Sequence, residues 1–61
     1  MNGYELAEKV NEMLDNGEAR NITHALRQIG NVTGDKPGAL YQRMWRNGVT
    51  AGRRLRIPKG R

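Results

Sequence analysis

The sequence predicts an all-α fold, a bundle of three short helices followed by a basic C-terminal arm. Apolar residues recur at helical spacing in three successive segments, and a glycine follows each segment. A chain of 61 residues makes one domain at most, near the lower size limit for a core that folds without help. We therefore expect one trihelical domain over residues 1–48, and a basic flexible tail or short strand over residues 49–61.

The first helix is expected over residues 3–16. Leu6, Val10 and Leu14 recur every four residues and predict the face that meets the core. Acidic side chains lie between them, and Gly17 follows as a C-terminal stop. Because this outer face is acidic, we interpret the helix as a support and not as a contact to an anion.

The second helix is expected over residues 21–33. Asn21 is a suitable N-cap, since its side chain can accept a hydrogen bond from a free backbone amide of the first turn. The apolar stripe follows at the spacing i, i+3, i+4 and i+7, and its largest members are Ile22, Leu26 and Ile29. Gly34 ends the pattern.

The third helix is expected over residues 36–47, with Asp35 as its N-cap and Pro37 in its first turn. Leu40, Met44 and Trp45 are expected in the core. The chain has no Phe, so we also expect Trp45, Tyr41 or both to supply aromatic area there.

The last segment changes character, because five positive charges stand among Gly52, Pro58 and Gly60 without an acidic residue. We prefer to interpret it as a disordered arm. Leu55 and Ile57 alternate with arginines, however, and this alternation leaves open a brief strand lying back on the helices.

The charge distribution points to a polyanionic partner. Five of the six acidic residues and one lysine lie in residues 1–18, whereas ten Lys or Arg and one acid follow from residue 19. No apolar run is long enough to span a bilayer, so we expect a soluble, cytoplasmic protein without a membrane partner. With no Cys and one His, we expect no metal site, and we expect neither a cofactor nor a small-molecule substrate.

The third helix also carries a stripe of small, amide and guanidinium side chains. Its members are Ala39, Gln42, Arg43 and Arg46. Gln42 can pair bidentately with adenine, and Arg43 can pair with guanine or hold a phosphate. Arg46 lies one turn later and is better placed for the phosphate backbone.

The second and third expected helices are amphipathic and joined by a short turn, and the third carries this stripe. This is the arrangement of a helix-turn-helix protein that binds double-stranded DNA. The third helix would enter the major groove, and the tail would contact phosphates or the minor groove. A monomer would cover one half-site, so symmetric binding would require a dimer of this chain. The expected DNA contacts are Lys36, Gly38, Ala39, Gln42, Arg43, Arg46, Arg53, Arg54, Arg56, Lys59 and Arg61.

Residues 22–46 resemble the second and third helices of small trihelical helix-turn-helix domains, of the Myb-like and the phage or bacterial regulator types. The matching positions are Gly34, Pro37, Ala39, Leu40, Arg43 and Trp45. The chain departs from the pattern at Lys36, where Thr or Ser would cap the helix, and Trp45 stands near the Myb position and not on it. The resemblance implies a small regulator, or an accessory factor in recombination, that acts on DNA in the bacterial cytoplasm, in the host if it is phage-encoded.

Two other functions stay open at this stage. The helical surface could bind a protein partner, for example as an anti-host factor, or the Arg-rich tail could bind RNA. We do not expect an enzyme, because the acids of the first helix suit a solvated face and the chain has no Ser or Cys to act as a nucleophile.

Overall fold

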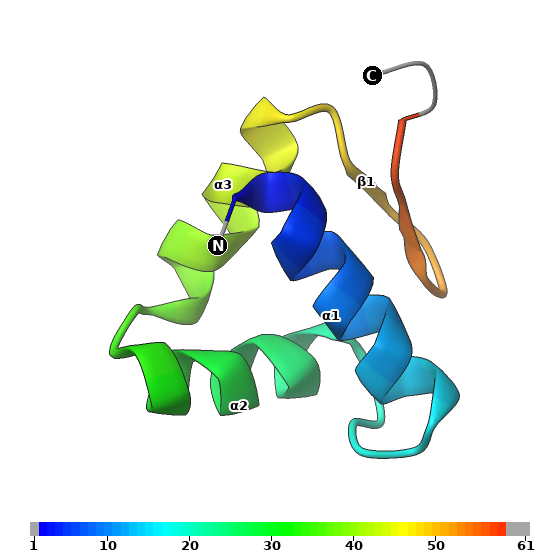
Figure 1. Ribbon diagram of the computed structural model, residues 1–61, viewed down its shortest axis with the longest axis vertical. Coiled ribbons are helices and arrows are strands. Elements are labelled where there is room, and N and C mark those ends of the chain that lie inside the picture. The colour runs from blue at the N-terminus through cyan, green and yellow to red at the C-terminus, as the bar shows by residue number, and fades with distance from the viewer. Residues whose placement is uncertain (1, 59–61) are drawn as a thin grey trace.

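Three helices and one β-hairpin make up residues 2–58, the part of the chain that the computed structural model describes. The helices are α1 (Gly3–Asp15), α2 (Ile22–Thr33) and α3 (Pro37–Arg46). The strands are β1 (Thr50–Ala51) and β2 (Leu55–Arg56). In Figure 1, α1 lies between α3 and the hairpin, and α2 closes the far end of the molecule. None of the helices described is long and apolar enough to cross a membrane.

The helices begin and end where local chemistry favours it. Asn2 and Glu5 form a capping box, in which the Asn2 side chain accepts from the Glu5 amide at 2.8 Å. Asn21 caps α2 as predicted, accepting from the His24 amide at 2.8 Å. Gly34 ends α2 in the left-handed conformation, with φ at +83°, where a residue with a Cβ would be strained. The three predicted helices are confirmed to within one residue at each end.

The core lies where the three helices and the hairpin meet. Of the nine predicted core residues, six are buried: Leu6, Val10, Leu26, Ile29, Leu40 and Met44. Leu14 and Ile22 are only partly buried and pack at its edge. Trp45 is not in the core, and the residues that take its place are Val49 and Leu55, buried to 3% and 4% exposure.

The basic C-terminal arm was the wrong interpretation for residues 50–56, which form the strand alternative instead. β1 and β2 pair antiparallel, with Thr50 opposite Arg56 and Ala51 opposite Leu55. The physical reason is Leu55: it points into the core while Arg54 and Arg56 stay exposed, so the alternation buries one side of the strand.

Candidate nucleic-acid interface

The start of α3 is set by Pro37, which occupies the first turn where its missing amide costs no hydrogen bond. A residue before proline is restricted to extended conformations, and Lys36 has φ −78° and ψ 145°. Lys36 is therefore the N-cap, and the expectation that Asp35 caps the helix was wrong. No side chain caps α3.

A close approach fixes the turn between α2 and α3. The Asp35 carbonyl lies directly over Gly30, where an added Cβ would overlap its oxygen. The Asp35 amide donates to the Thr33 hydroxyl at 3.3 Å. Only residues 34–36 separate the two helices, which run in clearly different directions (Figure 1). The direction in which α3 leaves α2 therefore depends on a glycine in the last turn of α2.

The other side of α3 is held against the start of α1. A Cβ at Gly3 would stand 2.6 Å from the carbonyl oxygen of Arg43 and would overlap the Asn47 side chain. Asn47 Nδ2 donates to the Arg43 carbonyl at 2.8 Å. α3 is thus held at both ends. The turn that packs on Gly30 holds its start, and the beginning of α1 packs against its end.

The predicted polar stripe of α3 forms one continuous surface. Gly38, Ala39, Gln42 and Arg46 are exposed, whereas Arg43 is half-buried at the edge next to α1. A shallow hollow is lined by Ala39, Gln42, Arg43, Arg46 and Asn47. Ala39, Gln42, Arg43 and Arg46 therefore lie together as predicted, but Arg43 is less accessible than predicted.

Trp45 lies on the surface of α3, so its predicted place in the core was wrong. Its side chain is 64% exposed, and Tyr41, one turn earlier, is 38% exposed. Their rings meet edge to face, with centroids 5.8 Å apart and an interplanar angle of 84°. Leu40 and Met44 already fill the buried side of α3, and the hairpin supplies the remaining apolar area.

The hairpin holds three of the predicted basic contacts, and they differ in their surroundings. Arg53 and Arg56 are exposed. Arg54 donates to the Asp15 carboxylate at 2.8 Å and so ties the hairpin to the end of α1. The predicted contacts Lys59 and Arg61 lie outside the described residues.

A second basic cluster, at the start of α2, was missed by the sequence analysis. Arg20 and Arg27 line one hollow together with Asn21, Thr23 and His24. Both arginines are exposed. The sequence feature that indicates this cluster is the position of the two arginines on either side of the capping residue Asn21. Arg20 then lies beside the first turn of α2, and Arg27 lies on the outer side of the helix.

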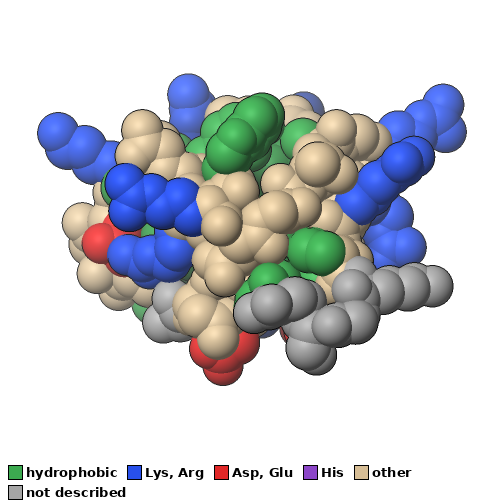
Figure 2. All heavy atoms as spheres, turned by 90° about the horizontal axis from the view of Figure 1, so that it is seen from above, with side chains coloured by type: hydrophobic (Ala, Val, Ile, Leu, Met, Phe, Trp, Pro, Cys, Tyr) green, Lys and Arg blue, Asp and Glu red, His purple; other side chains and the backbone are tan. Residues whose placement is uncertain are grey.

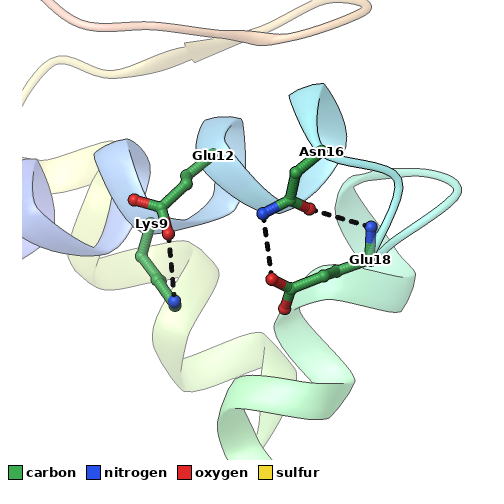
Figure 3. A network of polar contacts seen from close by, with 4 residues as sticks. All are labelled: Lys9, Glu12, Asn16 and Glu18. Atoms are coloured by element: carbon green, nitrogen blue, oxygen red, sulfur yellow. Dashed lines mark hydrogen bonds and ion pairs between the residues drawn. The ribbon is translucent and has the colours of Figure 1, made fainter.

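Acidic side chains in α1 and in the turn after it make local contacts. Lys9 Nζ lies 3.3 Å from a Glu12 carboxylate oxygen, and Asn16 and Glu18 exchange two hydrogen bonds of 2.9 Å (Figure 3). In the part of the chain that the structure describes, no three His, Asp or Glu side chains lie close enough to share a metal ion.

Seen from above, the molecule shows a group of hydrophobic side chains at the upper edge of the view, smaller ones lower down, and Lys or Arg side chains projecting on both sides (Figure 2). Comparison of the chain with protein-family models, with curated proteins and with solved structures finds no match.

Proposed function

We propose that this chain is a sequence-specific double-stranded DNA-binding protein, in which α2 and α3 form a helix-turn-helix and α3 enters the major groove. The observation that carries the proposal is the outer face of α3. It is exposed, it contains Gln42 and Arg46, and α3 has no acidic residue.

The dimensions of α3 suit this role. An α-helix with its side chains is about 10–12 Å across, and the major groove, about 12 Å wide, admits one helix. Gly38 and Ala39 are exposed in the first turn, where small side chains let the backbone come close to the bases. Gln42 follows one turn after Gly38 and is placed to bind an adenine edge.

The charges around α3 favour an anion on the same side. Lys36 precedes the helix, whose N-terminal end carries the positive end of the helix dipole. Arg46 ends it, and its side chain is placed for a phosphate. Arg20 and Arg27 at the start of α2 add a second group of cations that we assign to the phosphate backbone.

An amide-shift titration tests this proposal in two steps, first with a random duplex and then with a duplex selected from a random pool. We expect the largest shifts in α3 and at the start of α2, a higher affinity for the selected duplex, and an affinity for the random duplex that falls with salt. A structured RNA of equal charge is the matched competitor. Equal affinity for every duplex, or preference for the RNA, would contradict the proposal.

A further inference from the structure

The aromatic pair on α3 is not explained by the fold. Trp45 is the only Trp of the chain, and 64% of its surface is exposed although its indole is large and apolar. It follows Gly38 and Gln42 at the spacing i, i+4 and i+7, so the three residues lie in one line along the helix. The indole therefore lies beside the amide that we assign to a base edge.

The structure holds this ring in place. Tyr41 meets Trp45 edge to face at 5.8 Å, one helical turn away. Such a contact favours one orientation of the indole and lowers the entropic cost of ordering it in a complex. A fixed, exposed aromatic ring next to a hydrogen-bonding side chain is a surface arranged to recognise an apolar group with a polar group beside it.

The major groove offers one such group. Among the base edges it exposes, the C5-methyl group of thymine is the apolar one, and it adjoins the O4 acceptor of the same base. In an A·T pair the methyl group lies across the groove from the adenine N6 and N7 that an amide side chain can bind. Resting on the proposed function, we propose that Trp45, oriented by Tyr41, packs on a thymine methyl group next to the base pair that Gln42 contacts.

Charge favours duplex DNA over a protein partner at this site. Arg46 directly follows Trp45, Arg43 lies in the same turn, and α3 contains no acid that would repel phosphates. Val32, by contrast, is 87% exposed on α2 and lies by a hollow that includes Lys9 and Glu18. It is therefore an exposed apolar side chain outside the α3 surface and serves as a matched control.

Replacing single thymines of the selected duplex by uracil tests the proposal, because the change removes the methyl group and leaves the base pair. We expect at least one replacement to weaken binding of the wild-type protein about fourfold, which corresponds to about 0.8 kcal/mol for one buried methyl group. Trp45→Ala should bind the thymine and uracil duplexes equally well, whereas Val32→Ala should behave like the wild type. Quenching of Trp45 fluorescence by acrylamide should fall on binding the selected duplex.

Several outcomes would overturn the proposal, and they separate it from the proposed function. If the wild type prefers the selected duplex but no uracil replacement matters, DNA binding stands and methyl recognition falls. If uracil replacement lowers the affinity of the wild type and of Trp45→Ala equally, another residue makes the methyl contact. If sedimentation shows a dimer that Trp45→Ala abolishes, and uracil replacement has no effect on affinity, then Trp45 contacts a second copy of this chain and not DNA. Failure to prefer any duplex would remove both proposals together.

Discussion

The side chain of Asn11 pairs with the backbone of Leu55 as a neighbouring strand would. Asn11 Nδ2 donates to the Leu55 carbonyl at 2.9 Å, and the Leu55 amide donates to Asn11 Oδ1 at 2.8 Å. A two-stranded sheet leaves one edge of each strand without a partner, and a helix side chain satisfies both groups of this residue. The contact joins residues that are 44 positions apart and fixes the hairpin on α1.

Asn11→Ala should loosen the hairpin, because it leaves the amide and the carbonyl of a half-buried backbone without partners. We expect a loss of about 1–3 kcal/mol in the free energy of unfolding. Hydrogen exchange at the Leu55 amide should become faster than at core amides of α2. Glu8→Ala is the control on the same helix, since Glu8 is exposed and its replacement should change stability little. If Glu8→Ala lowered the free energy of unfolding as much as Asn11→Ala, the contact between Asn11 and Leu55 would have no special role.

Leu55→Ala should destabilise the whole protein and not only the hairpin. Leu55 is 4% exposed and belongs to the core shared by the helices, and removal of a buried leucine side chain costs about 2–5 kcal/mol. A domain of this size has few kcal/mol in total, so truncation at Gly52 should unfold most of the chain. Urea denaturation followed by circular dichroism measures both effects. A truncated chain with unchanged helix content would restore the arm interpretation.

The two main errors of the sequence analysis have one physical cause. Periodicity predicted the helices well, because each apolar stripe needs only local spacing to be recognised. The prediction of Trp45 in the core followed from the absence of Phe, which leaves three helices with little other apolar area. The missing area comes from Val49 and Leu55, in a segment whose charges favoured an arm. The packing of Val49 and Leu55 on the helices and the two hydrogen bonds between Asn11 and Leu55 are long-range contacts, which periodicity does not report.

The polar stripe of α3 was predictable for the same reason as the helices. Its residues are three and four positions apart, so a helical period suffices to bring them together. The half-buried state of Arg43 was not predictable, because it depends on the close passage of Gly3 in α1. The cluster at the start of α2 was not predicted, because Arg20 lies before the helix and its position beside Arg27 depends on the turn that Asn21 caps.

Gly30→Ala and Gly38→Ala should change stability in opposite directions, although both add one methyl group to a helix. At Gly30 the new Cβ meets the Asp35 backbone, which cannot rotate away, and we expect a loss of about 1–3 kcal/mol. At Gly38 nothing lies within 4 Å, so the better helix propensity of Ala should add about 0.5–1 kcal/mol. Thermal melts of the two variants give the comparison. A stabilised Gly30→Ala variant would contradict the tight turn.

Gln42→Ala should weaken binding to the selected duplex by about 1–3 kcal/mol and leave random-duplex affinity nearly unchanged, because an amide that pairs with a base edge carries sequence information. Arg46→Ala should instead weaken binding to the selected and to the random duplex by similar factors, as expected for a phosphate contact. Arg43→Ala should lower affinity for the selected duplex more than for random DNA if its guanidinium reaches a guanine. Parallel titrations of the three variants at one salt concentration measure these affinities. If Gln42→Ala lost the same affinity for both duplexes, Gln42 would be a phosphate contact and not a base contact.

The hairpin arginines should contribute affinity without specificity. Arg53 and Arg56 are exposed, so replacing both by Ala should leave the fold intact, whereas Arg54 also pairs with Asp15 and is kept. Each phosphate contact contributes about 0.9 to the slope of log K against log salt, so the double variant should flatten that slope by up to about 1.8. Its preference for the selected over the random duplex should stay the same. A salt series with both duplexes measures slope and preference together. An unchanged slope would show that the hairpin only completes the core, and a lost preference would show that it contacts bases.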